Sequence, residues 1–368
     1  MKLNRMLTLF LAFLVVFVPA AAAAELPNLS GQTINVIGLW SGDEQRSFEA
    51  VLARFVELTG ADVVYSPTPD NLATVLGTRV EGGNPPDIAI LPNPGLVQDF
   101  ARRGFLVPIE EVAGDLVDQY YAPVWRELGS VDETLYGVWY KAANKSVVWY
   151  NTNIFAEVGL EVPTTWEEMI EAAEMIDFFG ITPFSTGGAS SWVLTDWFEN
   201  IYLRVAGPEM YDKLVNHEIS WTDETVLEAF GYLKQVLGRS EWLAGGVEGT
   251  LEATHPEGIV KPFLNPPQAA MAYGADFSVS AIANETNSVV GVDALFFDFP
   301  SINGSPQAVV GGGDVVVMMK DTAGAKALIQ FLATPEAAEI WAARGGLTSP
   351  NQGVDLSVYP NEIVAASA

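Results

Sequence analysis

The sequence has no cysteine, and its only histidines, His217 and His255, lie far apart in the 368 residues. The absence of cysteine excludes disulfides, a thiol nucleophile and a lipid anchor on a cysteine side chain. Two isolated histidines give no spacing typical of a zinc site, so we expect neither a bound metal nor another cofactor. The stability of such a chain must come from a large hydrophobic core.

Basic residues are also scarce, with 18 Lys and Arg against 46 Asp and Glu and a formal net charge of −28. Nucleic acids and anionic membranes bind through clusters of Lys and Arg, so we expect neither as a partner. The same charge disfavours anionic solutes and leaves neutral and cationic ligands open. With this many carboxylates, some pairs will lie close together by chance. A pair of acids alone is therefore no evidence for a glycosidase.

Long hydrophobic runs are confined to residues 1–24. Lys2 and Arg5 precede a run rich in Leu and Val, and Ala22 to Ala24 follow it. A basic start, a short apolar run and small residues at its end are typical of a secretory signal peptide. The run falls short of the ~20 apolar residues that span a bilayer. We therefore predict cleavage near Ala24 and an exported protein, either periplasmic or fully secreted.

The remaining chain alternates predicted strands and helices, which is typical of an α/β fold. A strand at residues 33–39 is followed by Ser41 and Glu44 at capping-box spacing, then by a helical pattern and a second strand at residues 61–65. In such a unit the ligand-facing groups lie beyond the carboxyl end of the first strand. The residues at that place are Trp40, Asp43 and Glu44. No glycine-rich phosphate loop accompanies them, so a nucleotide is not implied.

The stretch from residue 132 to 153 is predicted to cross between two lobes, because 368 residues exceed one core. Alternating residues 136–140 predict one strand, and the apolar run 147–150 predicts a strand buried on both faces. The polar side chains between the two runs are those of Lys141, Asn144 and Lys145. Crossings of this kind line clefts, and clefts bind ligands.

Several later segments carry polar groups beside aromatic residues. A third strand at residues 87–91 leads to Asn93, and a glycine-rich loop enters the segment with Trp192, Asp196 and Trp197. Glu168 has capping-box spacing from Thr165, so we interpret it as a helix cap and not as a catalytic acid. Residues 289–300 predict a second crossing, and residues 308–319 predict two strands that flank the turn GGGD.

The ten tryptophans are the most informative feature, because several lie at predicted strand ends beside Asp, Asn or Gly. Sugar rings stack their apolar faces on aromatic side chains, while their hydroxyls need fixed donors and acceptors. Trp192, beside glycines and an acid, is a candidate platform of this kind. An aromatic cage for a cationic amine uses the same residue types. The residues alone leave a sugar, a polyamine or quaternary amine, and a secreted glycosidase as alternatives.

Segments along nearly the whole chain resemble the bacterial extracellular solute-binding proteins of ABC transporters, in the group of maltose-binding protein and alpha-glucoside-binding proteins. These segments are GLWSGDEQRSFEAVLARFVELTG, PPDIAILPNPGLVQDFARRGFLVPI, YGVWYKAANKSVVWYN, VPTTWEEM, TDWFENIYLRVAGPEMYDKL, AMAYGADF and GGGDVVVMMK. The resemblance implies a monomer of two α/β lobes, each a mixed sheet flanked by helices. The lobes close by hinge motion on an alpha-linked di- or oligosaccharide, which a membrane permease then receives, with no catalysis.

Carried over residue by residue, the resemblance also implies domain boundaries and a ligand site. Residues 25–140 and 294–345 would form lobe 1, and residues 141–293 and 346–368 lobe 2, which would be truncated because family members usually continue further. The implied site residues are Trp40, Asp43, Glu44, Asn93, Lys141, Asn144, Trp192, Asp196, Trp197, Tyr273, Asp276, Phe277, Gly312, Gly313 and Asp314.

Overall fold

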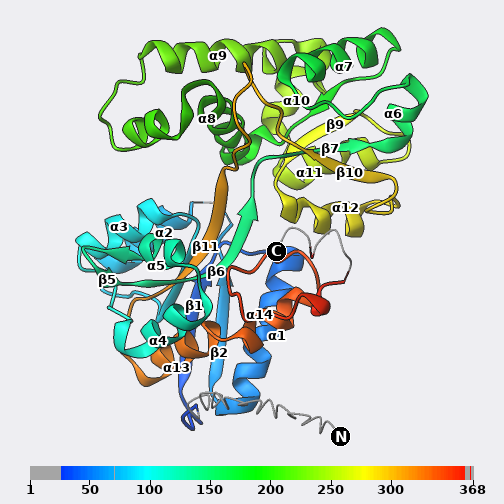
Figure 1. Ribbon diagram of the computed structural model, residues 1–368. Coiled ribbons are helices and arrows are strands. Elements are labelled where there is room, and N and C mark those ends of the chain that lie inside the picture. The colour runs from blue at the N-terminus through cyan, green and yellow to red at the C-terminus, as the bar shows by residue number, and fades with distance from the viewer. Residues whose placement is uncertain (1–25, 70, 361–364, 366–368) are drawn as a thin grey trace, which may run out of the picture.

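The computed structural model describes residues 26–69, 71–360 and 365, so the predicted signal peptide lies outside the described residues. The chain forms two α/β lobes, one above the other in Figure 1, which two extended segments connect. None of the helices in the described ranges combines the length and the apolar character that crossing a bilayer requires.

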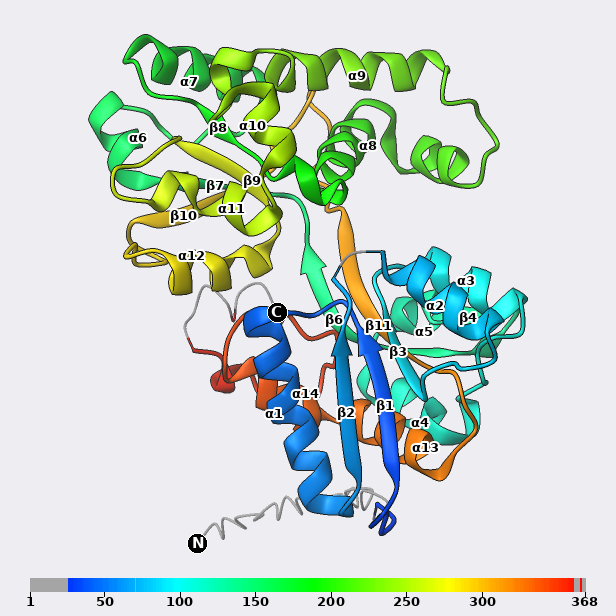
Figure 2. The same ribbon diagram turned by 180° about the vertical axis from the view of Figure 1, so that it is seen from behind.

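The first lobe is built on a five-stranded sheet in the order β2-β1-β3-β11-β6. β1 is parallel to β2 and β3, whereas β11 is antiparallel to β3 and β6. Figure 2 shows β1 and β2 in front, with α1 beside them. The strands are β1 (Thr33–Gly38), β2 (Asp62–Pro67), β3 (Ile88–Leu91), β6 (Gly137–Asn144) and β11 (Gly311–Met318), and the helices are α1 (Gly42–Thr59), α2 (Leu72–Glu81), α3 (Pro94–Arg102), α4 (Glu110–Tyr120), α5 (Pro123–Leu128), α13 (Ala323–Leu332) and α14 (Pro335–Ala342).

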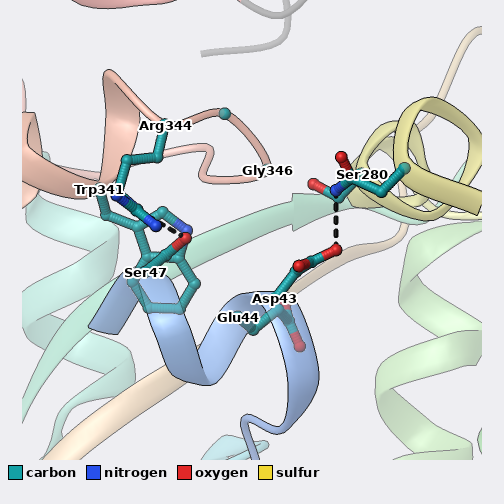
Figure 3. A pocket seen from close by; sticks show the side chains of 9 residues that line it. Asp43, Glu44, Ser47, Ser280, Trp341, Arg344 and Gly346 are labelled. Carbon is teal, nitrogen blue, oxygen red and sulfur yellow. Dashed lines mark hydrogen bonds between the residues drawn. The ribbon is translucent and has the colours of Figure 1, made fainter. Parts of the chain in front are cut away.

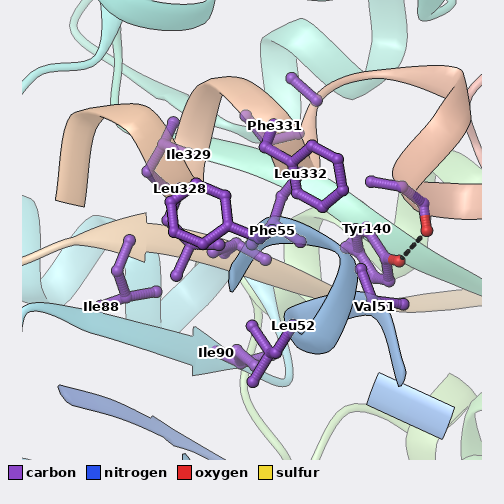
Figure 4. Packing of buried hydrophobic residues seen from close by; sticks show 14 of the residues in the cluster. Val51, Leu52, Phe55, Ile88, Ile90, Tyr140, Leu328, Ile329, Phe331 and Leu332 are labelled. Carbon is purple, nitrogen blue, oxygen red and sulfur yellow. Dashed lines mark hydrogen bonds between the residues drawn. The ribbon is translucent and has the colours of Figure 1, made fainter. Parts of the chain in front are cut away.

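Alternation along the strands divides the core of this lobe into two layers. Ile88 and Ile90 of β3 belong to one hydrophobic cluster, and Ala89 and Leu91 belong to another on the opposite face. This is the period of two that a strand imposes on its side chains. Figure 4 shows the first layer, where Tyr140 packs beside α1 and its hydroxyl donates to the carbonyl of Ala337 at 2.7 Å.

The second lobe has a four-stranded sheet in the order β10-β7-β9-β8. Every residue of β7 is buried, as the sequence predicted. Its strands are β7 (Val147–Asn151), β8 (Phe184–Ser185), β9 (Met271–Gly274) and β10 (Ala294–Asp298), and its helices are α6 (Thr152–Val158), α7 (Trp166–Phe178), α8 (Trp192–Val215), α9 (Glu224–Leu237), α10 (Gly246–Glu252), α11 (His255–Val260) and α12 (Val279–Glu285). A small separate ribbon pairs β4 (Ser130–Val131) with β5 (Thr134–Leu135), and short 3-10 turns are η1 (Gly188–Ser190), η2 (Ser240–Trp242), η3 (Lys261–Phe263), η4 (Asp276–Ser278) and η5 (Leu356–Val358).

The two sheets are joined at one place. Only Lys145 and Ser146 separate β6 of the first sheet from β7 of the second, and residues 299–310 lead back from β10 to β11. The two segments are hydrogen bonded: Lys145 N donates to Val310 O at 3.0 Å, and Phe299 N donates to Ser146 O at 2.7 Å. The crossings therefore lie side by side: the first falls within the predicted stretch 132–153, and the second begins at the end of the predicted stretch 289–300.

The structure differs from the predicted lobe boundaries in two segments. Residues 294–298, predicted in lobe 1, form β10 and pair antiparallel with β7 in the second sheet. Residues 347–360, predicted in lobe 2, return to the first lobe, where Leu347 and Tyr359 are buried in the cluster around α1 and α14. Apolar contacts formed far along the sequence decide both placements, and local patterns do not record them.

Two local predictions are also wrong. The GGGD segment is not a turn between two strands: Gly311–Met318 is one strand, β11, with a bulge between Asp314 and Val315. Ser41 stands at the N-cap of α1, yet its side chain makes no capping hydrogen bond. Glu44 pairs instead with Lys141 of β6, because that buried ammonium needs a counter-charge.

Candidate functional site

Lys141 is the centre of the polar cluster on the first lobe. Its side chain is only 4% exposed, its ammonium pairs with the Glu44 carboxylate, and its strand neighbour across the sheet is Asp314. Asp314 in turn accepts a hydrogen bond from the indole nitrogen of Trp40 at 2.7 Å. Burial acts to lower the pKa of Lys141, but the carboxylates of Glu44 and Asp314 outweigh it, and the pKa is raised. The ammonium therefore stays charged between two acids.

Aromatic rings form the facing part of the second lobe. The Trp192 and Phe277 ring centroids lie 6.0 Å apart, at 45°. His255 lies against both, 4.9 Å from Trp192 and 5.4 Å from Phe277, and its Nε2 is 3.1 Å from the hydroxyl of Ser278. Burial lowers the pKa of His255 to about 3, and nearby Lys141 and Lys145 add to that shift. His255 is thus a neutral support for the two rings.

A second lysine joins these rings to an acid. The Nζ of Lys145 lies 3.1 Å from Asp196 Oδ1 and 5.0 Å from the centroid of the Trp192 ring. Asp196 lies on the buried face of α8. Burial raises its pKa to about 6, although Lys145 opposes the shift. Burial likewise raises the pKa of Glu199, one helical turn further on. The second lobe therefore carries its own lysine–carboxylate pair beside its aromatic platform.

Polar and cationic contacts join the two lobes. Lys141 Nζ lies 4.4 Å from the centroid of the Phe277 ring on the opposite lobe. Asn284 of α12 donates to Asp43 of α1 at 2.7 Å. Thr348 donates to Asp276 at 2.9 Å. Every contact joins a residue implied by the sequence to the other lobe, so these side chains line the space where the lobes meet.

A cavity of about 340 Å³ lies at this junction. Figure 3 shows Asp43 and Glu44 of α1 on one side and Ser280 of α12 on the other, with Arg344 and Trp341 closing the first-lobe wall. The Arg344 guanidinium donates to Ser47 at 3.2 Å. The wall is mostly polar, with donors and acceptors from both lobes, and Lys141 contacts it through Glu44. The lining residues are Asp43, Glu44, Ser47, Ser280, Asn284, Trp341, Arg344, Gly345 and Gly346.

Other residues implied by the resemblance stand behind this surface. Trp40, Trp197 and Tyr273 are at most 2% exposed. The Trp197 and Tyr273 ring centroids lie 4.6 Å apart at 38°, and the Tyr273 hydroxyl donates to Lys145 O at 2.7 Å. These rings can position the residues in front of them, but they offer a ligand no free face.

The four remaining residues have mainly backbone roles. Asn93 is exposed and caps α3, where its side chain accepts from Leu96 N at 2.9 Å. The Asn144 side chain accepts from Ser146 N at 2.8 Å and so shapes the first crossing. Gly312 and Gly313 pair with Ala143 and Ala142 of β6. The sheet thus holds the backbone of these two glycines close to Lys141, and they contribute no side chain there.

Sequence reasoning missed several residues of the junction. Lys145 was visible as a polar residue between buried runs, but nothing indicated that it would reach α8. His255 follows Thr254 at a helix start and carries no motif. The others lie on segments that no local pattern places at the junction, namely Ser280, Asn284, Trp341, Arg344 and Thr348.

The arrangement can bind a polar molecule that has an apolar face, and it resembles no metal centre. No group of three or more potential ligands from His, Cys, Asp and Glu is clustered within the described ranges. A family model for the bacterial extracellular solute-binding proteins matches residues 41–339. The chain belongs to this family.

Two relatives cover most of this solute-binding protein. The osmoprotective compounds-binding protein GgtB of Synechocystis sp. is 34% identical over 381 residues, 100% of this chain and 88% of GgtB. The alpha-glucosides-binding periplasmic protein AglE of Rhizobium meliloti is 36% identical over 351 residues, 91% of this chain and 75% of AglE. The predicted family is therefore confirmed, and with it the role of a solute-binding protein of an ABC importer.

Solved structures confirm the two-lobed fold. The bacterial solute receptor AcbH, which prefers D-galactopyranose, has a TM-score of 0.80 at 24% identity, over 91% of this chain and 85% of AcbH. Maltose-bound MalE3 of T. maritima has a TM-score of 0.73 at 18% identity, over 91% of this chain and 85% of MalE3.

Proposed function

We propose that the chain captures a neutral alpha-linked di- or oligosaccharide, of the alpha-glucoside type, and delivers it to the permease of an ABC importer. The observation that carries the proposal is the pairing of two half-buried rings, Trp192 and Phe277, with lysine–carboxylate pairs from both lobes. The rings suit the apolar faces of sugar units, and the charged groups suit their hydroxyls. The 36% identity to AglE supports the alpha-glucoside class.

The proposal divides the residues into those that contact the ligand and those that hold the contacting residues in place. Ligand contact belongs to Asp43, Glu44, Lys141, Trp192, Asp196, Asp276 and Phe277. A supporting role belongs to Trp40, Trp197, Tyr273, Asp314 and Asn144, and a backbone role belongs to Gly312 and Gly313. Asn93 follows β3, where it caps α3 and has no part in ligand contact in this proposal.

A cationic amine fits less well, although the site is acidic. Lys141 and Lys145 already hold their ammonium groups 4.4 Å from Phe277 and 5.0 Å from Trp192. An ammonium ligand would have to displace these groups or lie beside them, which like charge disfavours. A neutral sugar meets no such repulsion, and it can accept a hydrogen bond from Lys141.

Calorimetry with two panels tests the proposal. One panel holds maltose, trehalose, sucrose and a trisaccharide, and the other holds spermidine and choline. We expect binding of at least one disaccharide, weak dependence on salt, and no release of free glucose on prolonged incubation. Binding of an amine but of no sugar, or steady sugar hydrolysis, would overturn the proposal.

A further inference from the structure

The backbone of Lys145 is fixed from three directions. Its N–H donates to Val310 O at 3.0 Å, on the second crossing segment. Its carbonyl accepts from Asn200 Nδ2 at 2.9 Å and from the Tyr273 hydroxyl at 2.7 Å, both in the second lobe. Lys145, which lies in the first crossing, is therefore hydrogen bonded both to the second crossing and to the lobe that carries the aromatic platform.

The side chain of Lys145 runs over a glycine of β11, Gly312, before it reaches the platform. A Cβ built on Gly312 would collide with the Cε of Lys145 and come within 3.0 Å of its Cδ. Gly312 does not have a positive φ, so its backbone would accept alanine. An alanine at this position would therefore displace the lysine stem and not the backbone. The ammonium then ends between Asp196 and Trp192.

We propose that Lys145 is a positioning residue for the sugar site: its ammonium, near the Trp192 ring, fixes the Asp196 carboxylate, and its stem, lying over Gly312, ties this platform to β11. The inference rests on the proposed function and adds a residue to it. It also assigns Gly312 a role of its own, which is to leave room for the stem.

Lys145→Met tests the ammonium, because methionine keeps an unbranched stem and loses the charge. We expect sugar affinity to fall at least tenfold, with partial recovery in Lys145→Arg. Lys213→Met is the matched control, since Lys213 forms an exposed ion pair with Glu209 in the same lobe. If Lys145 served packing alone, its charge would not matter, and Lys145→Arg would bind sugar no better than Lys145→Met.

A pH profile separates positioning from packing. Asp196 is faced by Lys145, by Glu199 and Tyr211 of α8, and by Tyr273 of β9. Burial raises the pKa of Asp196 and Lys145 lowers it. Without the ammonium the pKa rises further, so acidification should weaken sugar binding at a higher pH in Lys145→Met than in the unmodified chain.

A double-mutant cycle tests the stem. Gly312→Ala should displace the lysine and weaken sugar binding, whereas in the Lys145→Ala background the same alanine should cost nothing further, because no stem remains. Residues in contact give such non-additive cycles. Additive effects, or wild-type affinity in Lys145→Met, would overturn the inference.

Carboxyl NMR of Asp196 separates the inference from the proposed function, since it needs no sugar. The titration midpoint should move upward in both Lys145→Met and Gly312→Ala. A moved midpoint in a protein that binds no sugar retains the positioning role and removes the sugar function. An unmoved midpoint removes the positioning role even if sugar binds.

Discussion

At the scale of single residues, burial separates the tryptophans by role. Trp192 is half-buried beside Lys145, whereas Trp197, five residues later on α8, is fully buried against Tyr273 and Phe299. Side chains five apart on a helix point in different directions. The same residue type thus serves the site in one case and the core in the other.

This difference predicts opposite outcomes for two alanine substitutions. Trp192→Ala should leave the fold intact and weaken sugar binding by about 1 to 2 kcal/mol, through loss of a stacking surface. Trp197→Ala should lower the free energy of unfolding by about 3 to 5 kcal/mol, because it leaves a cavity in the core. Calorimetry and denaturant unfolding measure the two effects. A stable Trp197→Ala protein with lost affinity would place the ring in the site after all.

Asp314 carries a prediction about pH. Burial raises its pKa to about 6, against the opposing effects of Lys141 and Trp40. Between this pKa and the lower ordinary value, the folded chain binds a proton that the unfolded chain does not. Its contribution to the free energy of unfolding therefore increases as the pH falls from 7 to 4, by on the order of 2 kcal/mol. Unfolding at pH 7 and at pH 4.5 measures it.

Asp314→Asn should flatten that increase, and the exposed Asp321→Asn should not. If the two variants respond alike to pH, the increase comes from the overall negative charge and not from the buried acid.

The sequence distinguishes such residues only in part. Lys141, Asp196 and Phe277 could be assigned to a site because they carry the family pattern at predicted element ends. The burial of Trp40 and Trp197 could not, since a tryptophan at a strand or helix end suits either a cleft or a core. The partner of Asp196 could not be found either, because Lys145 lies 51 positions away and meets it only through the crossing.

At the scale of elements, sequence spacing predicts a structure correctly where neighbouring residues alone determine it. Thr165 and Glu168 form the predicted capping box: the Thr165 hydroxyl accepts from Glu168 N at 3.2 Å, and the Glu168 carboxylate accepts from Thr165 N at 3.2 Å. Ser41 and Glu44 have the same spacing and form no box. Spacing cannot show that a buried lysine from another strand takes the glutamate.

Thr165→Ala should therefore lower the free energy of unfolding by about 1 kcal/mol and leave sugar affinity unchanged. Glu168→Ala should also destabilise the fold without changing affinity. The Glu168 carboxylate accepts hydrogen bonds from Thr164 and Thr165, which lower its pKa, and these bonds cap the helix. Denaturant midpoints and calorimetry on the same preparations check both. Abolished binding in Glu168→Ala would contradict its assignment as a cap.

The glycines of β11 give a second prediction at this scale. A Cβ on Gly313 would lie 2.5 Å from Lys141 O and 3.1 Å from the Trp139 ring, whereas a Cβ on Gly311 would meet nothing within 4 Å. Because a backbone oxygen cannot move aside cheaply, Gly313→Ala should cost about 1 to 3 kcal/mol of stability and disturb the β11–β6 pairing. Gly311→Ala is the matched control. Equal stability of the two variants would contradict the close approach of the strands.

At the scale of the whole molecule, the order of the chain does not follow the order of the lobes. β10 was predicted in the first lobe but completes the second sheet, and Leu347 returns to the first core. Sheet membership depends on long-range pairing, which one sequence does not record. The two-lobed architecture itself could be predicted, since it rests on the resemblance and on a chain too long for one core.

The geometry of the crossings leads to a prediction about closure. Within the described residues, the chain passes between the lobes only at residues 145–146 and 299–310, while Asn284 to Asp43 and Thr348 to Asp276 are contacts that rotation can break. A sugar that touches Trp192 on one lobe and Glu44 on the other interacts with both only when the lobes are close. It therefore shifts the population toward the closed form. A permease can distinguish the loaded protein by that shape.

Small-angle scattering with and without disaccharide measures this closure. We expect a smaller radius of gyration with sugar in the unmodified protein and no change in Trp192→Ala at a sugar concentration that leaves this variant unloaded. Asn284→Leu, which removes a contact of the closed form but lies apart from the rings, should bind more weakly while still compacting at saturation. Measurable sugar binding with an unchanged radius of gyration would mean a rigid cleft. In that case the permease would have to recognise the bound protein by something other than its shape.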